Sequence, residues 1–543
     1  MTSAAVPRRP LSRITAAAAA MVLLLSGCTQ LGSGSESASD GGGTDSGQEE
    51  PSGEPEHPLV DIGTSAAADL PSDPATDPDY SSYYEQDIEW GECEDVYADG
   101  IECGTLTVPL AWNDPDGKTI DLAVAQIPGT GQDDDSLVLN NGGPGVSGVN
   151  FLESAPYMFS PEVRSSYDLV GFDPRGVARS AGIECLSDEE TDDYLSETVE
   201  PGEAGGDEVF DDWEKKIAES CEANSGDLLP YLDTYSAARD MDVLRAALGS
   251  EKLDYLGFSY GTYLGSSFAD LYPERVGHFV IDGALDPKNT MDDFFAGRAA
   301  AFEDSADAFV QSCLDSGESC PVSGDVAEGK QQLNEFFDSV DKQPLDSGNP
   351  DRPLTGAIAR SVFYMLMYSD ELWDSGWDAI SAAMDGDGSL LLATVDQSNE
   401  RLLDGSYRTN FTYAITAVNC LDHPWIADEQ WQEDQAEQLA EEYPTFGAQM
   451  GDNGCGQWPV PPLREPAAIT ADGAAPILVI GTTHDPATPY PWAQSLAEQL
   501  DSGVLLTFEG QGHTAYGRSG GCIEEQVDAY LLEDTVPEDG FTC

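Results

Sequence analysis

Basic residues are scarce in this chain: 23 Lys and Arg stand against 101 Asp and Glu, and the formal net charge is −78. Beyond the N-terminus these basic residues form no cluster. Binding to nucleic acid is therefore disfavoured, because neutralising phosphates requires clustered Lys and Arg. The acidic residues are spread over the whole length. This pattern indicates a solvated acidic surface suited to demanding external conditions.

The chain also lacks an apolar run that would span a bilayer comfortably. Residues 16–25 are apolar and follow Arg8, Arg9 and Arg13, which is the order of a signal peptide. The run ends in Leu25-Ser26-Gly27-Cys28, which resembles the lipobox of bacterial lipoproteins. That resemblance implies cleavage before Cys28 and lipid attachment to its sulfur; an ordinary secretory signal is the alternative. We expect an extracytoplasmic protein, either lipid-anchored to the outer face of the cell membrane or secreted.

Cysteine and histidine spacings typical of zinc sites are absent, so we expect no metal and no other cofactor. Without Cys28, ten of the 11 cysteines remain, and an even number in an exported chain indicates disulfides. Sequence cannot determine their connectivity, but the cysteines fall into neighbouring couples. We therefore predict five local bridges: Cys93–Cys103, Cys185–Cys221, Cys313–Cys320, Cys420–Cys455 and Cys522–Cys543.

The composition divides the chain into regions. Residues 29–82 are rich in Gly, Ser, Asp, Glu and Pro, and we expect them to form a disordered acidic linker. In residues 83–289 strand-like and helical patterns alternate, and this alternation resumes in residues 466–543. Residues 290–465 show helical periodicity almost throughout, which predicts a helical cap. The fold class expected is α/β, with a mostly parallel sheet covered on both faces.

One serine stands where a strand pattern meets a helix pattern. Residues 253–258 are an apolar run, and an amphipathic segment follows Gly257-x-Ser259-x-Gly261. The two glycines remove side chains that would clash at a sharp strand-to-helix turn. The start of the helix would present free backbone N–H groups near the serine hydroxyl. This context predicts a nucleophile elbow with Ser259 exposed at its tip.

A serine hydroxyl needs a base and a carboxylate that orients the base. Of five histidines, His513 directly follows the last strand-like run in a glycine-flanked loop. Asp485 follows the run at residues 477–481 in the same way. The order Ser259, Asp485, His513 is the order found in α/β-hydrolases. We therefore predict these three residues as the catalytic set.

The chain resembles the secreted tripeptidyl aminopeptidases of actinobacteria, in the prolyl-aminopeptidase family of α/β-hydrolases. The resemblance covers about residues 83–543. It is carried by five motifs: Asn141-Gly142-Gly143-Pro144-Gly145, Asp173-Pro174-Arg175-Gly176, Gly257-Phe258-Ser259-Tyr260-Gly261, Asp485-Pro486-Ala487-Thr488-Pro489 and Gly512-His513. Two positions depart from the usual family pattern, Asn141 where His is common and Ala178 where the arginine motif often reaches a glycine.

The resemblance implies roles at particular positions. Ser259 is the nucleophile, His513 the general base and then acid, and Asp485 the orienting carboxylate. The N–H groups of Tyr260 and Gly143 form the oxyanion hole. Thr488 is implied to hydrogen-bond within the Asp485 loop.

The resemblance also implies the substrate, namely short peptides cleaved from a free N-terminus with release of tripeptides. Such an enzyme needs carboxylates to pair with the α-ammonium of the substrate, and Asp282 and Asp422 are candidates. The chain is expected to act as a monomer. Two alternatives stay open: a carboxylesterase with the same triad, and a non-catalytic surface-binding lipoprotein on an inherited hydrolase fold.

Overall fold

The computed structural model of this chain describes residues 58–63, 70–71, 73–94, 96, 98, 100–131, 135–198, 206–317, 320–451 and 454–543. The predictions for Cys28, for the signal peptide and for most of the linker lie outside these residues. Residues 57–543 form one compact unit. No helix in the described ranges is both apolar enough and long enough to cross a bilayer.

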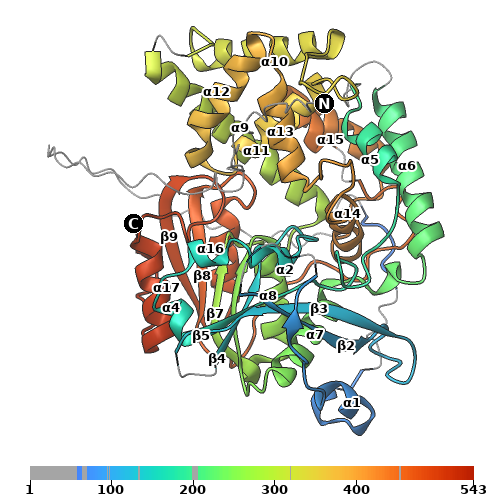
Figure 1. Ribbon diagram of the computed structural model, residues 1–543, viewed down its shortest axis with the longest axis vertical. Coiled ribbons are helices and arrows are strands. Elements are labelled where there is room, and N and C mark those ends of the chain that lie inside the picture. Colours follow the sequence, from blue (N-terminus) through green and yellow to red (C-terminus); the bar gives the residue numbers. More distant parts are fainter. Residues whose placement is uncertain are drawn as a thin grey trace, which may run out of the picture. The chain divides into compact units, whose positions relative to one another are not determined.

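A ten-stranded sheet forms the centre of the unit, in the order β1-β2-β3-β5-β4-β6-β7-β8-β9-β10 (Figure 1). The strands from β5 to β10 in this order pair in parallel, and β1, β2 and β3 pair antiparallel at one edge. The predicted mostly parallel α/β fold is confirmed. The strands are β1 (Gly91–Glu92), β2 (Glu102–Pro109), β3 (Thr119–Ile127), β4 (Asp135–Asn140), β5 (Tyr167–Phe172), β6 (Leu253–Phe258), β7 (Val276–Asp282), β8 (Ile477–His484), β9 (Gly503–Gln511) and β10 (Phe541–Thr542).

Both faces of the sheet are buried, because alternate side chains of the central strands enter two different apolar cores. In β4, Val138 packs on one side with residues of α7, α8 and α16. Leu137 and Leu139 pack on the other side with residues of α2, α3, α4 and α17. Near-continuous apolar strands are typical of parallel sheets covered in this way. These helices are α2 (Gly148–Phe151), α3 (Ala155–Met158), α4 (Val163–Ser166), α7 (Thr234–Ala247), α8 (Tyr260–Leu271), α16 (Tyr490–Gln499) and α17 (Cys522–Glu533).

The described residues between 291 and 442 contain seven α-helices, as the periodicity predicts. Six of them share an apolar core of their own, and the helix at residues 411–422 joins the core that lies against the sheet. Polar side chains start several of them: Thr290 and Asp325 each form a reciprocal capping box with the residue three positions on. The helices are α9 (Met291–Ser316), α10 (Val326–Lys342), α11 (Gly356–Leu366), α12 (Trp373–Met384), α13 (Ser389–Ser398), α14 (Phe411–Asp422) and α15 (Glu429–Glu442). We call this set the cap.

The region before α7 also contributes to the surroundings of the cap. Two helices there, α5 (Asp188–Leu195) and α6 (Gly206–Ser225), were not predicted. Asp192 of α5 accepts hydrogen bonds from Arg401 and Tyr407, which lie between α13 and α14. The short helices elsewhere are α1 (Ser81–Tyr84), η1 (Pro74–Thr76), η2 (Pro78–Tyr80), η3 (Leu229–Tyr231), η4 (Pro273–Arg275), η6 (Asp370–Leu372) and η7 (Gly447–Met450).

The predicted disordered linker, residues 29–82, ends too late, because its last part packs on the folded body. Leu59 forms a bridge with Ile426 of the cap region, and the amide of Gly63 donates to the carbonyl of Pro462. Residues 74–80 form two short 3₁₀ helices, and Tyr80 is only 3% exposed against Trp112. Composition suggested disorder, but a few apolar side chains in this segment are enough to dock it on the body.

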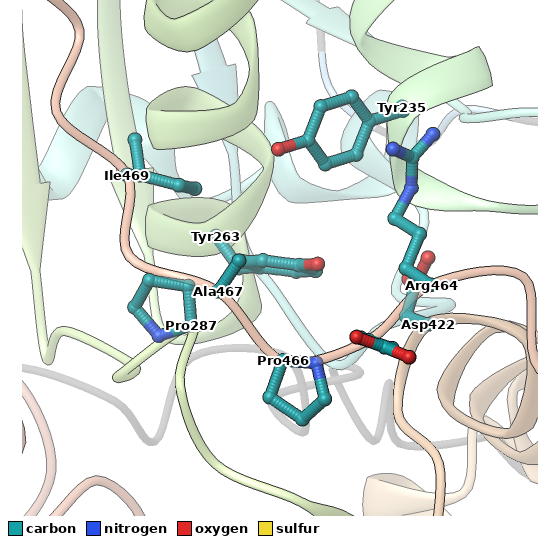
Figure 2. Close-up of a pocket in the computed structure, with 9 residues that line it drawn as sticks. Tyr235, Tyr263, Pro287, Asp422, Arg464, Pro466, Ala467 and Ile469 are labelled. Atoms are coloured by element: carbon teal, nitrogen blue, oxygen red, sulfur yellow. The ribbon is translucent and has the colours of Figure 1, made fainter.

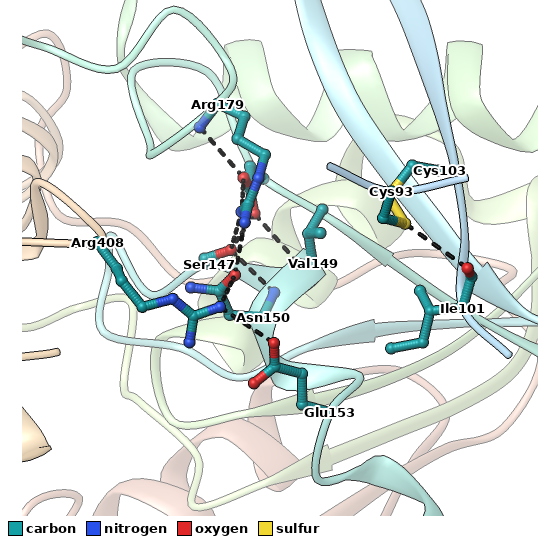
Figure 3. The surroundings of a disulfide bond; sticks show 10 residues. Cys93, Ile101, Cys103, Ser147, Val149, Asn150, Glu153, Arg179 and Arg408 are labelled. Carbon is teal, nitrogen blue, oxygen red and sulfur yellow. Dashed lines mark hydrogen bonds and ion pairs between the residues drawn. A yellow bond between two sulfur atoms is a disulfide. The ribbon is translucent and has the colours of Figure 1, made fainter. Parts of the chain in front are cut away.

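All five predicted disulfides are present in the predicted pairing. Figure 3 shows the Cys93–Cys103 bridge, which joins β2 to the segment before it. The same view shows Arg408, which follows α13, bonded to Glu153 and Asn150 beside α2. The disulfide thus links neighbouring segments, and the hydrogen bonds of Arg408 link parts of the chain that are far apart in sequence.

Arg175, from the predicted Asp-Pro-Arg-Gly motif, is a buried structural residue. Its side chain is 1% exposed and bonds both carboxylate oxygens of Asp240 at 2.7 Å. It also donates to the carbonyls of Leu110 and Tyr231. The guanidinium therefore joins the end of β2, the loop after β5 and helix α7.

We predict that Arg175→Met lowers the free energy of unfolding by about 3–5 kcal/mol, because it leaves Asp240 as an unpaired buried charge. Urea denaturation of the full chain measures this change. Lys118→Met is the control: Lys118 pairs with Asp227 at a solvent-exposed site, with side chains 69% and 87% exposed, and little change is expected. Equal destabilisation by both substitutions would contradict the role given to Arg175.

Candidate active site

Ser259 stands on a strained turn between β6 and α8. Its backbone has φ 56° and ψ −123°, which a non-glycine residue rarely adopts. A Cβ on Gly257 would lie 2.5 Å from the carbonyl oxygen of Gly261, so the two glycines permit the close turn. The amide of Ser259 donates to the carbonyl of Asp282 at the end of β7. The structure therefore has the geometry of the predicted elbow.

Asp485 and His513 form a close pair. His513 Nδ1 lies 2.9 Å from both carboxylate oxygens of Asp485. Asp485 is 2% exposed and also accepts hydrogen bonds from the amides of Ala487, Thr488 and Thr514 and from the hydroxyl of Thr488. An ionised carboxylate only accepts, so the Nδ1 atom carries the proton and Nε2 presents its lone pair. Thr488 bonds the Asp485 loop as predicted.

The Nε2 atom of His513 is buried and has no hydrogen-bond partner among the described residues. Ser259 and His513 both lie against the turn that ends β7: Asp282 accepts the amide of Ser259, and a Cβ on Gly283 would lie 3.0 Å from Cε1 of His513. Ser259 and the Asp485–His513 pair are thus both next to the turn after β7, and their joint role in catalysis stays a prediction. The catalytic hydrogen bond between a serine and its base often forms only once substrate is bound.

The glycine-rich turn after β4 passes beside Ser259. A Cβ on Gly142 would lie 2.9 Å from Cβ of Ser259 and 3.2 Å from the amide of Tyr260. Within the described chain, neither the amide of Gly143 nor that of Tyr260 donates a hydrogen bond. Two free N–H groups close to a serine are what an oxyanion hole requires.

Asp173 supports this turn, a role that its place in the family motif did not reveal. The carboxylate is fully buried and accepts hydrogen bonds from the hydroxyl of Ser147 and the amide of Val149, directly after the glycines. Burial raises the pKa of Asp173, while these bonds oppose the shift. A strand-terminal Asp before Pro174 was the only sequence signal for it.

Asp282, one of the two residues predicted to pair with a substrate ammonium, has a structural role. The residue is 0% exposed, and its oxygens accept hydrogen bonds from the amides of Ala515 and Tyr516. Burial raises the pKa of Asp282 to about 6, although these hydrogen bonds oppose the shift. Asp282 therefore holds the loop that carries His513.

Asp422 makes no hydrogen bond to a triad residue in the described part of the chain. It lies at the end of α14, is 3% exposed and accepts hydrogen bonds from the amide and hydroxyl of Thr234. Thr234 in turn bonds the hydroxyl of Tyr260 at 2.5 Å. Asp422 lines a cavity of about 260 Å³ with Tyr235, Tyr263 and Arg464, and no triad residue lines that cavity (Figure 2). Asp422 is thus placed to orient the side chain of Tyr260 through Thr234. Its predicted contact with the substrate ammonium stays a prediction.

Two further histidines have contacts outside the triad. His278 bonds Asp254 and Asp534 at the opposite end of the sheet. His484 bonds Asp304 of α9 at 2.7 Å. Neither side chain hydrogen-bonds Ser259 or Asp485 in the described part of the chain, which agrees with the choice of His513 as the base.

The protonation of Asp422 should show in the stability of the protein. Burial, with a contribution from the nearby charge of Asp233, raises the pKa of Asp422 to about 7 from an ordinary value of 3.8. The folded state therefore keeps a proton that the unfolded state releases between these values, and stability falls as pH rises through this window. We predict that Asp422→Asn, which cannot ionise, gains about 2–4 kcal/mol relative to wild type between pH 4 and pH 8.

Urea denaturation of both proteins at several pH values measures this difference. Comparing the two proteins removes the contribution of distant groups that titrate alike in both. Stability curves that stay parallel over the whole pH range would refute the prediction.

Comparison with known proteins agrees with this geometry. Residues 443–543 match a protein-family model described as TAP-like protein. The chain is 35% identical to serine protease Hip1 of Mycobacterium tuberculosis, over 84% of this chain and 91% of that protein. It is 32% identical to carboxylesterase B of the same species, over 84% and 89% of the two chains.

A third relative is the tripeptidyl aminopeptidase of Streptomyces lividans, which is 31% identical over 84% of this chain and 86% of that protein. Each of these relatives is matched over 84% of this chain. The chain is therefore a serine hydrolase and belongs to the TAP-like family of actinobacterial α/β-hydrolases.

Proposed function

We propose that this protein is an exported serine aminopeptidase that cleaves short peptides, with release of tripeptides, from a free N-terminus. The observation that carries the proposal is the Asp485–His513 pair: its Nε2 has no hydrogen-bond partner among the described residues, and both the pair and the strained Ser259 lie next to the turn after β7. Relatives named as a serine protease and as a tripeptidyl aminopeptidase support a peptide substrate. The cap supports selection of short chains, because it covers the carboxyl end of the sheet through contacts such as Tyr368 with His513.

In the proposed reaction, Ser259 Oγ attacks the scissile carbonyl carbon while His513 Nε2 takes the hydroxyl proton. The N–H groups of Tyr260 and Gly143 donate to the oxygen that becomes negative. His513 then gives its proton to the leaving nitrogen, and the C–N bond breaks to leave an acyl-enzyme on Ser259. Water, deprotonated by Nε2, hydrolyses the ester, and Asp485 stays ionised throughout and keeps the imidazole oriented.

Export and anchoring are part of the proposal. Five disulfides require an oxidising compartment, which supports a location outside the cytoplasm. The lipobox-like sequence that ends at Cys28 supports a lipid anchor on the outer face of the membrane.

An ester substrate is the second candidate, because one relative of nearly equal identity is named carboxylesterase B. The triad geometry serves both reactions, since the attack on an ester carbonyl uses the same three groups. The two functions differ in what must be recognised at the amino end of the substrate.

A matched substrate panel separates these candidates. We predict that a tripeptide anilide with a free N-terminus is hydrolysed with at least about a hundredfold higher kcat/KM than its N-acetylated twin, since acetylation removes the charge that an aminopeptidase must pair. Release of the aniline is followed by absorbance, and a simple acyl ester serves as comparison. Turnover of the ester alone would contradict the aminopeptidase and favour the esterase.

Substitution of the triad gives a second prediction. Asp485→Asn should lower kcat by about 10⁴ without unfolding the protein, because the imidazole then takes the wrong tautomer. Ser259→Ala should lose turnover and all labelling by a fluorophosphonate. Circular dichroism and thermal melting check the fold of both variants. If wild-type protein is folded yet unlabelled, the non-catalytic binding function is favoured.

A further inference from the structure

A cationic side chain of the cap lies near the catalytic base without a counter-ion. Arg298 is in α9, and its guanidinium donates to the hydroxyls of Tyr364 and, at 3.1 Å, Tyr368. Its carbon Cζ lies 4.9 Å from the ring centre of Phe294 and 5.4 Å from that of Phe302. The Nε atom is buried and has no partner, and no carboxylate of the described residues lies within ion-pair distance.

This arrangement is unusual in a chain with 101 acidic residues. Other arginines of the cap region are paired: Arg352 with Asp396, Arg360 with Asp341, Arg401 with Asp192 and Arg408 with Glu153. A buried charge costs several kcal/mol unless it is paired, so an unpaired guanidinium needs another reason for its position. A carboxylate supplied by a ligand would satisfy it in a planar two-pronged contact.

Three contacts place α9 over the catalytic loops. Phe294 stacks on Trp492 at the start of α16, with ring centres 5.6 Å apart. Asp304 accepts a bond from His484, the neighbour of Asp485. Tyr368, which bonds Arg298, has its ring centre 5.5 Å from that of His513. Arg298 therefore lies on the His513 side of the site.

The side of the site decides which part of a substrate the cation meets. His513 gives its proton to the leaving nitrogen, so the space around the imidazole receives the leaving group. The oxyanion and the acyl part face Tyr260 and the glycine turn. A cation on the His513 side is thus positioned for the leaving group and not for the N-terminal part.

We propose that Arg298 is a specificity-determining residue that binds a carboxylate of the leaving group. The carboxylate comes either from the C-terminus of a short peptide or from an acidic side chain just after the scissile bond. The inference rests on the proposed function and adds to it a preference on the leaving side: peptides only slightly longer than the released fragment, or peptides with an acidic residue after the cleavage site, are favoured.

A purely positioning role for Arg298 makes a different prediction. Burial alone would lower the pKa of Arg298, but Tyr364, Tyr368 and Asp485 raise it, so the guanidinium stays charged. In a positioning role this charge would only hold these neighbours in place. If this were its only role, its loss would slow all substrates equally, with or without a carboxylate on the leaving group.

The test uses the full chain and two pairs of tetrapeptides, with products identified by mass spectrometry. The first pair is Ala-Ala-Ala-Ala with a free or an amidated C-terminus. The second pair is Ala-Ala-Ala-Glu-amide and Ala-Ala-Ala-Gln-amide, which differ only in a side-chain charge. We expect kcat/KM to be about tenfold higher for the carboxylate member of at least one pair. The pair that responds identifies the source of the carboxylate.

Variants assign the preference to the guanidinium. Arg298→Gln should abolish it, and Arg298→Lys should retain part of it because the charge remains. The matched control is Arg360→Gln, another cap arginine whose carboxylate partners lie within the cap, and it should keep the full preference. Wild-type protein that treats both pairs alike, or an Arg298→Gln protein that keeps the preference or slows every substrate equally, would overturn the proposal.

Acetate esters of 4-hydroxybenzoate and 4-hydroxybenzamide repeat the comparison without a peptide bond. A preference for the carboxylate-bearing ester, lost in Arg298→Gln, would support the site even if no peptide is cleaved. In that outcome the aminopeptidase function fails while the carboxylate site stands. If peptides and esters are cleaved with no such preference, the aminopeptidase function stands and the carboxylate site fails.

Discussion

The paired hydrogen bond between His513 and Asp485 is the contact on which the chemistry of this fold depends. It determines which imidazole nitrogen is free, and the surrounding structure is arranged to keep it in place. Asp485 is held by amides of its own loop, and the His513 loop is held by the buried carboxylate of Asp282. Loss of any of these hydrogen bonds would rotate or displace the imidazole, and Ser259 would then lack a base.

Much of the fold could be predicted because each core element has a local signature. Apolar runs ending in turn residues identified the strands from β2 to β9, and neighbouring cysteines identified the five bridges. Helices α5 and α6 were missed, and so was the docking of Leu59 and Tyr80. These segments are polar or short in sequence, and their order comes from contacts with distant residues that a local pattern does not contain.

The site could be predicted to a similar depth. Ser259, Asp485 and His513 were found because glycines, strand ends and chain order all point to them. The structural role of Asp282 was not predicted, since a strand-terminal carboxylate has the same sequence signature whether it faces a substrate or two backbone amides. Ala178 shows how structure explains a departure from the family pattern: its φ of 42° is the conformation that favours the glycine common there.

The carbonyl of Tyr368 accepts a hydrogen bond from the amide of His513, so a residue of the cap region holds the backbone that bears the imidazole. A movement of the cap would therefore also move the proton acceptor. If the cap moved far enough to break this hydrogen bond, Ser259 would lose its aligned base. Hydrolysis would then proceed only while the enclosure is shut.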